Sequence, residues 1–123
     1  MGLFGLYWDT KTSLTRLAQT YLEPGTPIDH LLLGSRDPIM PRWLLVFTGE
    51  SIVVIEVDVN PKSGITRPFS DVPRMVLPRK TRIGPIYGHG WILVGGQRLF
   101  VPMSKRKIAA IDAEAGFPPP NAR

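Results

Sequence analysis

The chain has 123 residues, a size that suits a single domain with a hydrophobic core of its own. It contains no cysteine, which excludes disulfides, thiolate metal ligands and cysteine nucleophiles. Thirteen prolines and twelve glycines interrupt the chain so often that long helices are not expected.

The net charge of +5 is unevenly distributed along the chain. Residues 61–107 hold ten lysines and arginines against one acid, Asp71, whereas the rest of the chain is net negative. Such a stretch attracts polyanions, which include nucleic acid, anionic lipid and acidic protein surfaces. The alternative is a solvated surface that keeps the domain soluble.

The first 24 residues combine an apolar segment with a short amphipathic helix. The apolar segment consists of Leu3, Phe4, Leu6, Tyr7 and Trp8. If exposed, these side chains would form a patch typical of an interface. Residues 9–22 follow, with one apolar helical face made of Leu14, Leu17, Ala18, Tyr21 and Leu22. We expect this helix to pack on a sheet of the same domain; contact with a partner or membrane is the alternative.

Two runs of β-branched and aromatic residues form the centre of the pattern. Residues 43–47 and 52–57 flank a polar break at Gly49, which indicates an antiparallel hairpin. Because both runs are almost continuously apolar, we expect these strands to be covered on both faces. A preceding strand is expected over residues 28–34.

The strands after the central hairpin are expected to be short and to lie at an edge. Residues 65–69 contain Pro68, and residues 71–77 contain Pro73 and are followed by Pro78. Proline has no amide hydrogen for a sheet, so it favours edges and bulges.

A second hairpin and a helix complete the domain. Strands are expected over residues 91–94 and 98–101, joined by a turn at Gly95, Gly96 and Gln97. The side chain of Trp91 is expected in the hydrophobic core. A helix is expected to begin after a Ser104 cap and to end at Gly116, with Ile108, Ala109, Ile111 and Ala115 on its buried side. The division is therefore an N-terminal segment (1–24), a β domain (25–116) and a flexible proline-rich tail (117–123).

This order of about seven strands and a terminal helix resembles the pleckstrin-homology-like domains, especially the small bacterial and GRAM-like members. Two stretches carry the resemblance: residues 43–55, and residues 91–102 running into the terminal helix. The resemblance implies a mainly β, antiparallel barrel or roll over residues 28–116, with the helix closing one open end. Ile108 and Ile111 would then meet side chains from the strands. The N-terminal amphipathic helix is an addition to that pattern.

Catalytic and metal-binding patterns are weak. His30 and His89 lie far apart and lack the neighbours of a metal motif, and the glycine-rich stretches 84–90 and 95–96 do not match a phosphate-binding loop. Glycines on both sides of His89 permit either a turn or the close approach of a ligand. We expect that the protein is not an enzyme and that it binds no cofactor or metal.

We therefore expect a noncatalytic, cytoplasmic binding module that docks on a protein partner or on the anionic inner face of a membrane. It would use the apolar N-terminal segment and a basic face made of Arg74, Arg79, Lys80, Arg82, Arg98, Lys105, Arg106 and Lys107. Nucleic-acid binding through residues 74–107 is the alternative, because cations interleaved with aromatic residues can hold a phosphate backbone. The oligomeric state and the identity of the partner stay open.

Overall fold

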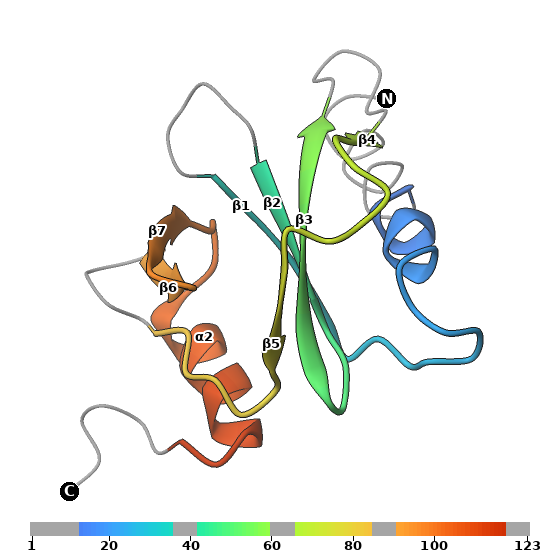
Figure 1. The fold of residues 1–123 in the computed structure, drawn as a ribbon. Helices are drawn as coiled ribbons and strands as arrows, with labels where there is room; N and C mark the ends of the chain where they lie inside the picture. Colours follow the sequence, from blue (N-terminus) through green and yellow to red (C-terminus); the bar gives the residue numbers. More distant parts are fainter. Residues whose placement is uncertain (1–12, 36–41, 60–65, 85–90, 118–123) are drawn as a thin grey trace, which may run out of the picture.

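The computed structural model describes residues 13–35, 42–59, 66–84 and 91–117. A helix over residues 13–19 precedes an antiparallel sheet, and a second helix, α2, follows it (Figure 1). The elements are β1 (His30–Ser35), β2 (Arg42–Phe47), β3 (Ser51–Val59), β4 (Thr66–Pro68), β5 (Met75–Pro78), β6 (Trp91–Val94), β7 (Gln97–Phe100) and α2 (Lys105–Glu114). The expected class, mainly antiparallel β with a helix at each end, is confirmed.

The sheet is open. Its strand order is β4-β3-β2-β1-β7-β6, with β5 pairing on β3. β4 pairs with the last residues of β3 and β5 with its first residues, so the two share one edge. No pairing joins this edge to β6 among the described residues. The expected closure into a barrel is therefore wrong.

Proline explains why the sheet stops at this edge. Pro68 pairs with Val57 and Pro78 with Ser51, which confirms both strands as edge strands. Between them the chain keeps only two backbone contacts to β3, from Phe69 N to Glu56 O and from Arg74 N to Val54 O. The strand expected over residues 71–77 thus begins only at Met75.

The central hairpin forms as expected. β2 and β3 pair from Arg42↔Val57 to Phe47↔Ile52, and Thr48 closes the turn. The Thr48 backbone amide donates to Ser51 O (2.9 Å), and its Oγ1 accepts from the Ser51 amide (3.1 Å). The second bond gives a partner to the hydroxyl of Thr48, a residue that is almost fully buried.

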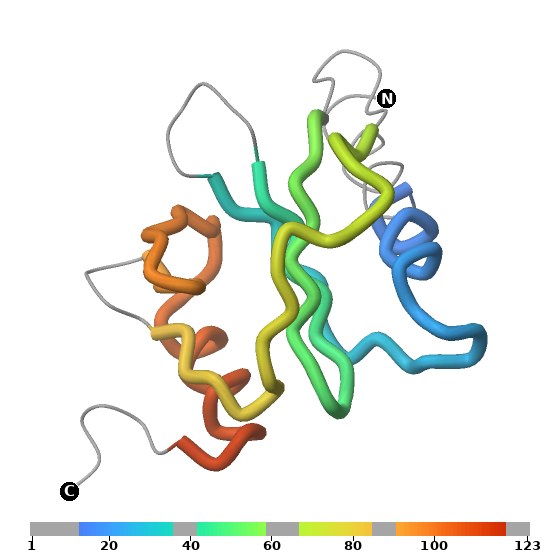
Figure 2. The backbone as a smooth tube through the Cα atoms, viewed as in Figure 1, coloured from blue at the N-terminus to red at the C-terminus, as the bar shows by residue number. Residues whose placement is uncertain are grey.

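Both faces of β1–β3 are covered, which confirms the expectation from their apolar runs. One face packs against α2, the β6–β7 hairpin and Ile83. The other packs against Leu14 and Ala18 of the N-terminal helix. Figure 2 shows this helix and α2 on opposite sides of the three strands. The amphipathic helix therefore packs on its own domain.

The β6–β7 hairpin turns through two residues, whereas a three-residue turn was expected. Gly95 and Gly96 both have positive φ angles, 57° and 81°, as a type I′ turn requires. The register pairs Val94 with Gln97, Ile92 with Leu99 and Trp91 with Phe100. β7 joins β1 at a single pair, Ser35↔Phe100.

Helix α2 packs across the inner side of this hairpin. Its N-cap is Ser104, whose side chain accepts from the Lys107 amide at 3.2 Å, as expected. Ile108 and Ile111 are buried in the cluster that contains the strand residues. Asp112 is the third buried position, whereas Ala109 and Ala115, expected on the buried side, are only half-buried.

Candidate functional site

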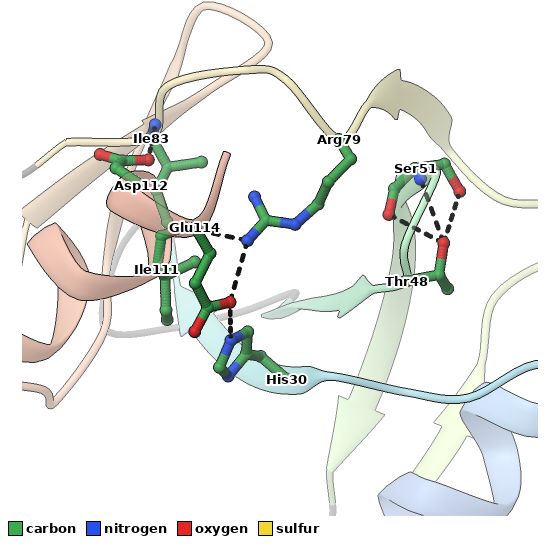
Figure 3. A network of polar contacts seen from close by, with 8 residues as sticks. All are labelled: His30, Thr48, Ser51, Arg79, Ile83, Ile111, Asp112 and Glu114. Carbon is green, nitrogen blue, oxygen red and sulfur yellow. Dashed lines mark hydrogen bonds and ion pairs between the residues drawn. The ribbon is translucent and has the colours of Figure 1, made fainter. Parts of the chain in front are cut away.

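A polar network at the C-terminal end of α2 is the first group of residues that could do chemistry (Figure 3). Asp112 is almost fully buried, and its two carboxylate oxygens accept from the Ile83 amide (2.9 Å) and the Gly84 amide (3.0 Å). Burial raises the pKa of Asp112; the two amide hydrogen bonds and the charges of Arg82 and Arg79 oppose that rise. Asp112 thus fastens the segment before residue 85 to α2.

Arg79 is part of the same network. Its Nη2 donates to Ile111 O (2.9 Å) and to Glu114 Oε1 (3.3 Å), and its guanidinium lies 5.2 Å from the centre of the Phe47 ring. Its side chain is only 11% exposed. Arg79, expected on the basic face, therefore lies largely inside the fold and holds the end of α2 against the sheet.

Glu114 links the network to β1. Its Oε1 lies 2.7 Å from His30 Nε2, and the hydrogen bond to His30 is the main reason why the pKa of Glu114 is lowered. His30, at the first position of β1, also makes an edge contact with the Phe47 ring. The pair joins the last turn of α2 to the sheet.

The Glu114 contact predicts a pH effect. A lowered pKa means that Glu114 contributes stability above its ordinary pKa of 4.5, and that this contribution is lost as the pH falls through the lower folded value. We expect Glu114→Gln to cost less than about 1 kcal/mol at neutral pH, since the carboxylate is half exposed. The difference in unfolding free energy from the wild type should vanish in acid, as urea denaturation between pH 3 and 7 would measure. A difference that grows in acid would contradict this assignment.

The polar side chains of these contacts are engaged within the fold. The hydroxyls of Thr48 and Ser51 serve the central turn, and Asp112 and Arg79 serve the fold. In the part of the chain that the structure describes, no group of three or more histidine, aspartate or glutamate side chains could hold a metal ion. A pocket of about 470 Å³ has one ionisable side chain in its lining, which consists of Gln19, Leu22, Glu23, Pro24, Gly25 and Thr26.

The other expected basic residues are exposed. Arg74 lies apart from the rest: its guanidinium is 4.9 Å from the centre of the Trp43 ring and 3.5 Å from Glu56. The remaining six lie on the segment before residue 85, on β7 and on the first turn of α2. They are Lys80, Arg82, Arg98, Lys105, Arg106 and Lys107.

The described residues divide into two sides of unlike charge. We call residues 79–84 and 91–117 the basic side, since they hold seven basic residues and two acids, Asp112 and Glu114. Both acids point into the network described above. The other described residues, which form β1–β5 and the N-terminal helix, hold four basic residues and six acids. Because α2 and the β6–β7 hairpin cover one face of β1–β3 and the N-terminal helix covers the other, the excess of positive charge lies on one side of the central strands (Figure 1).

Part of the expected site falls outside the described residues. This applies to the apolar N-terminal segment (Leu3, Phe4, Leu6, Tyr7 and Trp8) and to His89. The roles expected for these residues therefore stay predictions.

A surface on the β6–β7 hairpin was missed. Cross-strand pairing puts Trp91, Leu93, Arg98 and Phe100 on one face, opposite the buried Ile92, Val94 and Leu99. Trp91 is half-buried and contacts Phe100 edge-on, 5.6 Å between ring centres, so the expected core role of Trp91 is wrong. All four residues 91–94 are apolar, so the sequence carried no alternation that would have indicated this face.

Comparison with known proteins gives no relative. No family model, no curated protein and no solved structure matches the chain. Among the described residues, no helix has the length and apolar character needed to cross a membrane.

Proposed function

We propose that this protein is a noncatalytic binding module that docks on an anionic surface, either of a membrane or of a protein partner, through its basic side. The observation that carries the proposal is the separation of charge. Six exposed cations lie on the basic side; of its two acids, Asp112 is buried and Glu114 is paired with His30 and Arg79. A field of this kind orients a domain on a negatively charged surface.

The apolar N-terminal segment, which lies outside the described residues, is proposed as a second contact, because apolar side chains add hydrophobic affinity to an electrostatic contact. The pleckstrin-homology-like assignment belongs to the same proposal. It is supported by the strand order and by a terminal helix whose Ile108 and Ile111 pack on the strands. The N-terminal contact rests on the sequence pattern, and the pleckstrin-homology-like assignment rests on the sequence pattern together with the architecture.

Charge reversal at the start of α2 tests the proposal. We expect Lys105→Glu/Arg106→Glu to weaken binding to vesicles of phosphatidylcholine and phosphatidylglycerol by about a hundredfold, since each cation near an anionic surface contributes on the order of 1 kcal/mol. Co-sedimentation at increasing protein concentration measures the effect. The variant should remain folded, because acidic residues in the first turn of a helix interact favourably with its dipole.

The matched control is Arg16→Glu/Arg67→Glu, which changes the net charge equally at exposed positions outside the basic side. It should lose much less affinity. Equal losses in the two variants would show that only net charge matters, and absence of binding to both the vesicles and an acidic protein partner would refute the proposal.

Nucleic-acid binding through residues 74–107 is the second candidate, favoured by the aromatic pair Trp91 and Phe100 beside Arg98. Its test is the salt dependence of binding to a single-stranded oligonucleotide. Neutralised phosphates release counterions, so affinity must fall steeply as salt rises. Affinity that is independent of salt would exclude this candidate.

A further inference from the structure

The outer face of the β6–β7 hairpin consists of Trp91, Leu93, Arg98 and Phe100, and its two strands bury only their other side. Leu93 and Phe100 remain 40% and 39% exposed, whereas their neighbours Ile92 and Leu99 are fully buried. This short hairpin therefore presents apolar side chains on both faces. One face has a partner within the fold, and the outer face is open to solvent.

One cation lies on this apolar surface, and three more follow it in the chain. Arg98 pairs directly with Leu93 across the hairpin. Lys105, Arg106 and Lys107 follow in the first turn of α2, only a few residues after β7 ends at Phe100. The basic side offers one exposed acid, Glu114, and that carboxylate is engaged by His30 and Arg79 at the opposite end of α2. Charge complementarity therefore selects an anionic occupant.

The apolar side chains decide between two anionic occupants. A strand of nucleic acid would require flat ring faces on which bases stack. Here the two rings meet edge to face at 69°, so they do not form one continuous stacking surface, and the neighbouring residue is the aliphatic Leu93. A mixture of tryptophan, phenylalanine and leucine with flanking arginine and lysine suits the interface of a lipid bilayer.

We propose that the outer hairpin face inserts Leu93 and Phe100 into the headgroup region of an anionic bilayer, with Trp91 at the interface and Arg98 on lipid phosphates, while Lys105–Lys107 add to the positive field of the basic side. This inference rests on the proposed function and deepens it, because it selects the membrane among the anionic surfaces and names the side chains that enter it. The contact is peripheral, and it combines hydrophobic insertion with electrostatic attraction.

The test compares three proteins on vesicles of phosphatidylcholine and phosphatidylglycerol in equal parts. Relative to the wild type, Leu93→Ser/Phe100→Ser should partition about tenfold less, since two half-exposed apolar side chains lose their transfer to the interface. The matched control is Phe69→Ser/Val72→Ser, whose apolar side chains are more exposed, 61% and 66%, but lie on the connection between β4 and β5. It should partition as the wild type does.

Tryptophan fluorescence gives a second measurement that does not depend on affinity. In the Trp8→Phe variant two tryptophans remain, and Trp43 is 1% exposed, so Trp91 is the one that can respond to lipid. We expect a shift of its emission to shorter wavelength on anionic vesicles, and quenching by phosphatidylcholine brominated near the headgroup. Unchanged emission from vesicle-bound protein would overturn the insertion of this face.

The outcomes separate the two proposals. If Lys105→Glu/Arg106→Glu abolishes vesicle binding while Leu93→Ser/Phe100→Ser leaves it unchanged, electrostatic docking stands and the insertion is refuted. If the wild type binds no vesicles but binds a single-stranded oligonucleotide or an acidic protein, the membrane is excluded as the docking surface. The insertion of the hairpin face is then refuted as well. A loss in the hairpin variant, with an unchanged control and a blue-shifted Trp91, supports the insertion.

Discussion

Replacing either Leu44 or Leu45 with alanine should destabilise the protein by about 3 kcal/mol, and the two costs should be similar. The residues are adjacent on β2 and point to opposite faces of the sheet. Leu45 packs with α2 and the β6–β7 hairpin, and Leu44 packs with the N-terminal helix. Both are fully buried, so each substitution removes the same atoms and leaves a cavity. Urea denaturation of the two single variants measures the costs.

The matched position is Val76 on β5, which is 56% exposed, and Val76→Ala should cost less than about 0.5 kcal/mol. The comparison tests directly whether both faces of the central strands are covered. A cost below about 1 kcal/mol for Leu44→Ala, with the full cost retained for Leu45→Ala, would mean that the N-terminal helix does not cover its face of the sheet.

The substitution Asp112→Ala should lower the free energy of unfolding by about 3 kcal/mol at neutral pH, which is a large effect for a single carboxylate. It removes the acceptors of two amides, those of Ile83 and Gly84, and both of these residues are buried. Each buried donor left without an acceptor costs about 1–3 kcal/mol. Thermal and urea unfolding of the variant measure the loss.

The variant Asp112→Asn separates hydrogen bonding from charge. Asparagine keeps one acceptor oxygen but turns an amide group toward the other backbone N–H, so its cost should lie between those of the wild type and the alanine variant. A cost for Asp112→Asn equal to that of Asp112→Ala would mean that the charge, and not the acceptors, holds the segment.

Asp112 also has a pH dependence opposite to that of Glu114. Its pKa is raised by burial above the ordinary value of 3.8, so its contribution is fully present below that value and decreases as the pH rises through the folded pKa. The difference in unfolding free energy between the wild type and Asp112→Ala should therefore be largest in acid. The difference between the wild type and Glu114→Gln should disappear there. Two carboxylates two residues apart in one helix differ in this way because one is desolvated and the other is paired with His30.

Much of the fold could be predicted from the sequence because its signals are local. The apolar runs of β2 and β3 gave a hairpin covered on both faces, and Ser104 gave the start of α2. Pro68 and Pro78 marked edge strands because a residue without an amide hydrogen cannot pair on both sides. These effects depend on a residue and its near neighbours.

The candidate surface was predicted less well because it depends on register. A three-residue turn at Gly95–Gln97 would have set Phe100 opposite Ile92, whereas the two-residue turn sets Phe100 opposite Trp91 and Leu99 opposite Ile92. A shift of one residue exchanges the faces of a strand. The outer hairpin face therefore became visible only once the turn was known.

The sequence by itself determined the succession of strands and helices along the chain, the edge prolines, the Ser104 cap and the uneven charge, since each of these follows from local chemistry. Only the tertiary structure decided that the sheet stays open, that Arg79 turns inward to Ile111 and Glu114, and that Asp112 binds the backbone of Ile83 and Gly84. Those contacts join residues about 30 positions apart, and the direction of a long charged side chain depends on which acceptors the fold brings within its reach.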